Sequence, residues 1–292
     1  MILQSSISKL SNRLYKEALT RVGRKLARRI PEDVIERDYV LAWFLNEMAA
    51  QTLLATVLAF KGGTALRRVH FGEYRFSDDL DFTLTRSVSL DELFAAFKQV
   101  FDSLQAKSGI VMRLDEDNVT NHTRNDTFFF IYKGPLPAEK SVKVDVTRDE
   151  TIVFDLEGKP VIISYPEYAD LPQSAVLRVY ALYEIAVEKV LALTDGARRE
   201  PRDLYDLWFL LQEGHLQYPE EIVGGLSRKL ASRDGRDKDV LVPRLERVEA
   251  ALRVAWNKRL SAQVEILPPF DDSFREVKRL MRIFDELRGY GS

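Results

Sequence analysis

The sequence predicts an α+β fold, in which a mixed sheet flanked by helices is followed by a C-terminal helical bundle. Two observations support this prediction. Residues 110–163 alternate apolar and polar side chains with the period of two that is typical of strands. Nearly all of the chain after residue 177 instead has the spacing of amphipathic helices. A proline-containing stretch marks the change, and we expect two domains, 1–165 and 166–292.

Apolar spacing and the positions of glycine and proline predict the elements of the first domain. They are helix 7–29, helix 37–51, strand 53–60, helix 61–68, a strand within 76–85, a helix from Ser89 to about Ser103, strands 127–132 and 142–147, and a hairpin or edge pair within 150–163. Ser89 and Glu92 have the spacing of a capping box. The later helices are expected at 177–194, 202–213, 219–231, 243–259 and 271–288.

The composition excludes several kinds of site. The chain has 46% hydrophobic and 30% charged residues, which is typical of a globular protein. It has no cysteine, which excludes disulfides, thiolate metal sites and thiol nucleophiles, and its three histidines make a histidine-built metal site unlikely to form. The first residues do not have the pattern of a signal peptide, and polar residues interrupt the most apolar stretch, 39–60. We expect a cytoplasmic monomer that does not enter a membrane.

Basic residues gather in three places although the formal net charge is only −2. Residues 13–29 hold seven basic side chains and one acidic one, and smaller clusters lie at 198–202 and 228–253. Such patches can follow a nucleic-acid backbone, but they are also typical of solvated helix faces. Charge alone leaves both interpretations open.

Two carboxylates lie on one face of the strand predicted within 76–85. Alternation places Leu80, Phe82 and Leu84 on one face and Asp79, Asp81 and Thr83 on the other. Neighbouring carboxylates repel each other unless a cation neutralises them, and Mg²⁺ prefers such oxygen ligands. The pair therefore indicates a magnesium site, although acidic pairs are also common on ordinary surfaces.

A glycine turn follows the apolar run 53–60. Lys61-Gly62-Gly63-Thr64 opens a predicted helix, so that backbone amides and the Thr64 hydroxyl could approach a phosphate. The spacing is neither that of a Walker loop nor that of a Rossmann turn. An ordinary strand-to-helix turn is the alternative.

A third carboxylate, Asp145, lies on the predicted strand 142–147. If this strand pairs beside the Asp79–Asp81 strand, three carboxylates converge as a two-metal nucleotidyl transfer centre requires. Asp145 would then act as the general base for an attacking hydroxyl. The alternative is the exposed polar face of an edge strand.

One lysine of the helical half lies on an apolar stripe. Lys189 falls among Leu182, Ile185 and Leu193, where it must either extend to solvent or meet an anion such as a triphosphate. On the first interpretation, Lys189→Met should preserve or raise stability. Asp203 and Asp206 begin the next helix, where either could favour the helix N-terminus.

Together these motifs resemble the AbiEii/AbiGii-type nucleotidyltransferase toxins, which include the MenT toxins, in the DNA polymerase β-like superfamily. The resemblance rests on Lys-Gly-Gly-Thr at 61–64, Arg-Phe-Ser-Asp-Asp-Leu-Asp-Phe at 75–82, Glu-Lys-x-x-Ala-Leu at 188–193 and Arg-Asp-x-x-Asp-Leu at 202–207. It implies a polymerase β-like nucleotidyltransferase fold whose helical domain completes the active site.

The resemblance also implies a role for each motif residue. The metal ligands would be Asp79, Asp81 and Asp145, and the catalytic set would add Lys189 and Asp203 to these carboxylates. The nucleotide-binding residues would be Lys61, Gly62, Gly63, Thr64, Ser77, Lys189 and Asp206.

The function that the resemblance implies is that of a toxin that uses Mg²⁺ to move a nucleotide from an NTP to an acceptor, with the tRNA 3′ end favoured. A separately encoded AbiEi-like antitoxin would be its partner. Two alternatives stay open from the residues: a regulatory protein that binds GTP or another NTP without transfer, and nucleotidylation of a protein hydroxyl.

Overall fold

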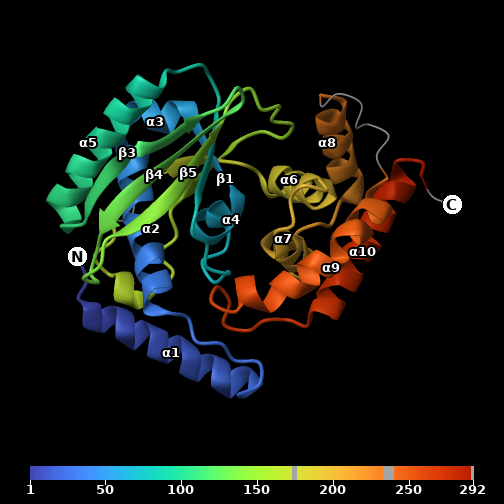
Figure 1. The fold of residues 1–292 in the computed structure, drawn as a ribbon, viewed down its shortest axis with the longest axis horizontal. Helices are drawn as coiled ribbons and strands as arrows, with labels where there is room; N and C mark the ends of the chain where they lie inside the picture. The colour runs from blue at the N-terminus through green and yellow to red at the C-terminus, as the bar shows by residue number, and fades with distance from the viewer. Residues whose placement is uncertain (173–175, 233–239, 291–292) are drawn as a thin grey trace. The chain divides into compact units, whose positions relative to one another are not determined.

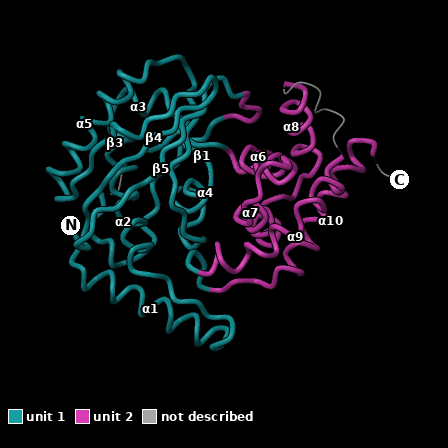
Figure 2. The backbone as a smooth tube through the Cα atoms, viewed as in Figure 1, with its two compact units in different colours: residues 1–150, 156–180, 262–265 teal, residues 151–155, 181–261, 266–292 magenta. Residues whose placement is uncertain are grey.

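The computed structural model describes residues 1–172, 176–232 and 240–290. The chain forms two compact units, which Figure 2 distinguishes by colour. Unit 1 comprises 1–150, 156–180 and 262–265, and unit 2 comprises 151–155, 181–261 and 266–292. The α+β class is confirmed, because the strands lie in unit 1 and a run of helices follows them in the chain. The division into domains 1–165 and 166–292 stays a prediction.

Unit 1 is built on a seven-stranded mixed sheet with the order β3-β4-β5-β2-β1-β7-β6 (Figure 1). The strands are β1 (Leu58–Lys61), β2 (Leu80–Leu84), β3 (Val111–Asn121), β4 (Asn125–Lys133), β5 (Lys140–Thr147), β6 (Glu157–Pro160) and β7 (Val176–Val179). The β2–β5 and β1–β7 pairs are parallel, and the other neighbours are antiparallel. The two strands expected to carry the acidic residues, β2 and β5, are therefore direct neighbours.

The helical elements of unit 1 surround this sheet in the chain order. They are α1 (Gln4–Val22), α2 (Glu32–Ala50), α3 (Thr52–Val57), α4 (Gly62–Ala65), a π-helical turn (Leu66–His70), α5 (Leu90–Ser108) and a 3₁₀ turn (Pro166–Tyr168). The capping box of α5 is confirmed, since Ser89 and Glu92 each accept from the other's backbone amide. Longer helices than expected at α5 and shorter ones at α1 follow from where their caps lie.

Aromatic packing against α2 and α5 decides which face of the sheet is apolar. The rings of Phe44, Phe97, Phe101 and Phe130 lie with centroids 4.9–6.4 Å apart, so these helices cover the sheet face on which Phe130 lies. Residues that pair directly across strands share a face. The register then assigns to this apolar face, strand by strand, Phe128 with Val144 and Leu80, and Val146 with Phe82. The acidic residues of β2 and β5 belong to the opposite face.

Unit 2 consists of packed helices, as the helical spacing predicts. They are α6 (Leu182–Thr194), α7 (Pro201–Gln212), α8 (Pro219–Ala231), α9 (Leu241–Leu260) and α10 (Phe270–Leu287). Trp256 lies at its centre at 2% exposure, with the rings of Tyr205 and Phe270 at centroid distances of 6.3 and 5.6 Å.

Two predicted elements are wrong. The expected strand 53–60 is helical as far as Val57, because the Gln51 side chain accepts from the Leu54 amide and caps α3, so that the strand begins only at Leu58. The expected hairpin within 150–163 does not form. Its strand β6 pairs with residues 176–179, which the helical pattern had assigned to the following helix. Pairing of β7 with β1 overrides the local helical spacing there.

Within the described ranges, the search for a helix that could span a membrane by length and apolar character finds none.

Candidate functional site

A row of polar side chains crosses four neighbouring strands on the face opposite α2 and α5. Lys61 of β1 pairs with Asp81 of β2, Asp81 with Asp145 of β5, and Asp145 with Thr127 of β4. Because directly paired residues share a face, the four side chains lie in line. The condition that the sequence left open for Asp145, a strand beside β2, is met by the register. Asp79 lies two residues before Asp81, directly ahead of β2.

The two glycines that follow β1 are needed for side chains to approach this row. Gly62 has a φ of 77°, which favours glycine, and a Cβ at this position would overlap the Asp81 carboxylate. A Cβ at Gly63 would overlap Nη2 of Arg75 and lie 3.0 Å from Oγ of Ser77. Ser77, expected at the nucleotide site, thus lies against the glycine turn. The pair of glycines is a close-approach motif in this structure.

The hydroxyl of Thr64 has a role that the sequence did not predict. It donates to the backbone carbonyl of Asp79, fifteen positions further along the chain. Thr64 is 2% exposed, so its side chain joins α4 to the segment that leads into β2. The expected donation to a phosphate oxygen would require this hydrogen bond to break.

Asp145 is neutralised within its own sheet. Its Oδ2 accepts from Nζ of Lys143 at 2.6 Å, and its Oδ1 accepts from the Thr127 hydroxyl at 2.5 Å. Among the described residues, no three His, Cys, Asp or Glu side chains are grouped so as to hold a metal ion. The donor types suit Mg²⁺, because Asp79 and Asp81 offer partly exposed carboxylate oxygens next to each other. Asp145 fits less well, because it is already paired.

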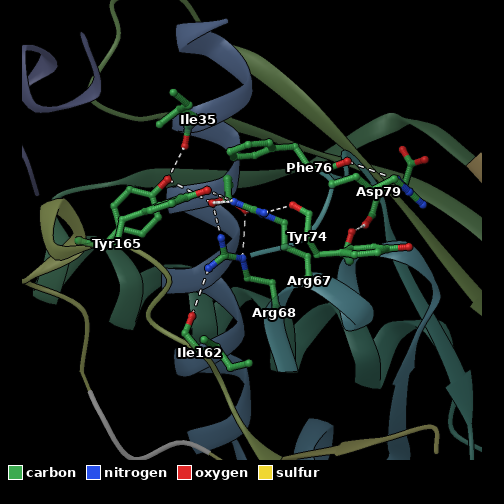
Figure 3. Close-up of polar contacts among 12 residues, drawn as sticks. Ile35, Arg67, Arg68, Tyr74, Phe76, Asp79, Ile162 and Tyr165 are labelled. Carbon is green, nitrogen blue, oxygen red and sulfur yellow. Dashed lines mark hydrogen bonds and ion pairs between the residues drawn. The ribbon is translucent and has the colours of Figure 1, made fainter. Parts of the chain in front are cut away.

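A buried ionic cluster lies behind the glycine turn, on the helical segment that follows it (Figure 3). Arg67 and Arg68 are 1% and 0% exposed, and both pair with Asp38 of α2. Figure 3 shows the two guanidinium groups side by side, with Arg67 reaching the carbonyl of Tyr74 and Arg68 that of Ile162. The cluster therefore fixes the turn against α2 and against two further segments of the chain.

Electrostatics in this cluster favour the charged carboxylate. Burial alone would raise the pKa of Asp38, but the two guanidinium groups outweigh burial and hold that pKa below its ordinary value. Burial also raises the pKa of Tyr165 and Tyr168, whose hydroxyls bond Arg67 and Asp38 respectively. Sequence reasoning missed this cluster. The available signal was an aspartate inside the otherwise apolar helix α2.

In unit 2, Lys189 is enclosed by the two aspartates of the motif that follows it. Its Nζ lies 2.7 Å from Oδ1 of Asp203 and 2.7 Å from Oδ2 of Asp206, and Arg198 lies 2.9 Å from the second oxygen of Asp203. The aspartates are 1% and 0% exposed and the lysine is 7% exposed. The ammonium thus has buried partners, and the expectation that Lys189→Met preserves or raises stability is wrong.

The basic clusters are partly paired. On α1, Arg13 bonds both carboxylate oxygens of Glu167, and Arg21 pairs with Glu265. Arg24 and Lys25, in the turn that follows α1, are exposed. The cluster expected within 228–253 falls in part on residues 233–239, outside the described residues.

Comparisons with known proteins agree with this architecture. MenT4, a nucleotidyltransferase toxin from Mycobacterium tuberculosis H37Rv, aligns with a TM-score of 0.61 at 20% identity, over 97% of this chain and 94% of that one. A candidate nucleotidyltransferase from H. pylori aligns with a TM-score of 0.57 at 16% identity, over 90% of this chain and all of the other. At these identities the likeness concerns the fold. The search of curated proteins returned no match.

A sequence comparison extends from fold to family. The family model described as nucleotidyl transferase AbiEii toxin, type IV TA system, matches residues 43–279. This range covers most of the chain and includes the glycine turn, the acidic strand β2, Asp145 and the Lys189 cluster. The protein therefore belongs to the family of AbiEii nucleotidyl transferase toxins of type IV toxin–antitoxin systems.

Proposed function

We propose that this toxin transfers a nucleotide from an NTP to the 3′ end of tRNA, in a reaction that depends on Mg²⁺. The observation that supports the proposal most strongly is the line of Lys61, Asp81, Asp145 and Thr127 on one sheet face. The glycine turn follows directly at the end of β1, so backbone amides and carboxylates come from adjacent positions. Phosphate recognition and acidic chemistry are thereby combined in unit 1.

Asp79 and Asp81 would hold the metal, with Asp145 as a further ligand once its pairing with Lys143 loosens. Mg²⁺ bound there would supply charge stabilisation for the phosphate oxygens. The glycine amides and Lys61 would bind the triphosphate, since amide and ammonium groups both donate to its oxygens. Lys61 is 9% exposed and its Nζ lies 5.4 Å from the centroid of the Tyr180 ring, which limits the positions that the ammonium can take.

The transfer itself is an exchange of phosphorus–oxygen bonds. The 3′ oxygen of the acceptor forms a bond to the α-phosphorus, and the bond from that phosphorus to the β-phosphate bridging oxygen breaks. Pyrophosphate leaves with that electron pair. The proton of the acceptor hydroxyl passes to a carboxylate oxygen of Asp145, which would act as general base.

The exposed cations that follow α1 would bind the acceptor RNA. Each phosphate contact releases counterions, so binding should weaken steeply as salt rises. Reversing Arg24 and Lys25 to glutamate should reduce the slope of log affinity against log salt by about 1–2, as measured with labelled tRNA. Lys98→Glu, an exposed site on α5, serves as the control. An unchanged slope would locate the RNA path elsewhere.

The experiment that tests the function is a transfer assay with the four α-labelled NTPs, bulk tRNA and total protein. Label on tRNA is expected, and it should disappear when Mg²⁺ is chelated. Label on protein instead would favour nucleotidylation of a protein hydroxyl. Saturable binding of GTP or another NTP with no transfer would favour a regulatory protein.

A type IV system pairs the toxin with an antitoxin. We propose that the antitoxin is a separate AbiEi-like protein with a winged helix. Growth rescue by co-expression tests this pairing, and loss of label from tRNA in the rescued cells would show that the antitoxin counters the transfer step.

A further inference from the structure

The connection between α9 and α10 contains a short segment that packs in unit 1. Residues 262–265 belong to unit 1, whereas the helices on both sides of them belong to unit 2. Gln263 is only 6% exposed. A buried glutamine must satisfy both its amide donor and its carbonyl acceptor, so its partners show what it holds.

One end of the Gln263 side chain holds the start of the segment that leads into β2. Its Oε1 accepts from Nη1 of Arg75 at 3.3 Å, and its backbone oxygen accepts from the amide of Phe76 at 2.7 Å. Arg75 is the residue whose guanidinium occupies the space beside Gly63. This end of Gln263 thus acts on the residue that packs against the glycine turn.

The other end of the side chain holds the residue directly before Asp79. Nε2 of Gln263 donates to Oδ2 of Asp78 at 2.8 Å, and Arg37 of α2 donates to Oδ1 of Asp78 at 2.9 Å. Asp78 is therefore fixed from two sides. Its neighbour Asp79 is fixed in turn through its carbonyl, which accepts from Thr64.

We propose that Gln263 is a positioning residue for the transfer site: it bridges Arg75 and Asp78 and so sets where Asp79 and Asp81 lie relative to the glycine turn. The inference rests on the proposed function. A displacement of catalytic groups by about 1 Å can cost about 10²-fold in rate, so loss of the bridge should reduce turnover more than substrate binding.

The first test measures the bridge without any reaction. Hydrogen exchange of the full-length protein, followed by mass spectrometry, is compared for wild type, Gln263→Met and the exposed control Gln217→Met. Gln263→Met should speed exchange at amides 76–81 by about five- to tenfold, because a buried hydrogen-bond partner is lost, and leave α5 unchanged. Unchanged exchange at 76–81 would overturn the proposal.

The second test exchanges donor and acceptor. Gln263→Glu places a carboxylate opposite Asp78, and Asp78→Asn places an amide opposite the Gln263 amide, so each single variant should lose transfer. The double variant Asp78→Asn/Gln263→Glu restores the bond with its direction reversed and keeps the net charge. We expect kcat to fall about 10- to 10²-fold in each single variant, with the KM for NTP nearly unchanged, and to recover in the double variant.

The outcomes separate two failures. No transfer by the wild-type protein with any acceptor would overturn the proposed function, and the exchange experiment would still report on the bridge. Transfer by the wild type with unchanged kcat in the single variants, or without recovery in the double variant, would overturn the positioning role of Gln263 alone.

Discussion

The two acidic groups of the family motifs are built in opposite ways. In unit 1, Asp79 and Asp81 are partly exposed on a sheet face. In unit 2, Asp203 and Asp206 are almost fully buried and both pair with Lys189. Buried carboxylates need such partners, whereas partly exposed ones can keep their charge in water and accept a cation. The difference indicates chemistry at the first group and structural stability at the second.

The largest expected effect is the loss of stability when Lys189 is removed. Lys189→Met leaves two buried carboxylates with Arg198 as the remaining cation described beside them, on Asp203 alone. The free energy of unfolding should fall by about 3–5 kcal/mol, as measured by urea unfolding. Lys258→Met, an exposed site on α9, is the matched control. A midpoint equal to or above that of the wild type would mean that the cluster does not stabilise the fold.

A smaller effect is expected when the glycine turn is filled. Gly62→Ala combines a positive φ with overlap against the Asp81 carboxylate, which should cost about 2 kcal/mol and reduce transfer about 10²-fold. Gly224→Ala is the control, because nothing lies within 4 Å of a Cβ there and alanine should stabilise helix α8 by about 0.5–1 kcal/mol. Equal activity of the two variants would show that the close approach of Asp81 is not needed.

The smallest effect concerns Glu265, whose carboxylate is half-buried. Burial raises its pKa, and the nearby Arg21 and Arg67 only partly oppose the shift. With a raised folded-state pKa, its favourable contribution is fully present below the ordinary pKa of 4.5 and is lost as pH rises through the folded-state value. Glu265→Gln should therefore gain stability relative to wild type at neutral pH, by less than about 1 kcal/mol.

Thermal unfolding of wild type and Glu265→Gln at the two pH values checks this sign. The gain should shrink toward the acidic end, where the wild-type carboxyl is protonated. A gain that grows as pH falls would mean that the pairing with Arg21 outweighs burial, so that Glu265 would join the paired carboxylates of unit 2.

Local patterns predicted much of the fold, and long-range pairing explains the rest. The capping box of Ser89 and Glu92 and the helices of unit 2 depend on neighbours in sequence, so spacing was sufficient to predict them. Strand β7 depends on β1, more than a hundred residues away, and its local spacing was helical. The hydrogen bond between Gln263 and Asp78 spans 185 positions and has no sequence signal.

The residues of the candidate site were predictable by type, but their pairing was not. Alternation placed Asp79, Asp81 and Asp145 on suitable faces, and the register of β2 with β5 brought two of them into line. The sequence did not reveal which charges are already neutralised. Lys189 was expected to meet a triphosphate, yet its ammonium is held between two aspartates one helix further along the chain.

The most direct test of the comparison measures stability and transfer together for Asp81→Asn and Asp206→Asn. The account predicts that Asp81→Asn unfolds within about 0.5 kcal/mol of wild type while transfer falls about 10²–10³-fold. Asp206→Asn should instead lose about 3 kcal/mol of stability, because Lys189 is left with a weaker buried partner. Wild-type transfer by Asp81→Asn, or a loss of stability as large as that of Asp206→Asn, would contradict the account.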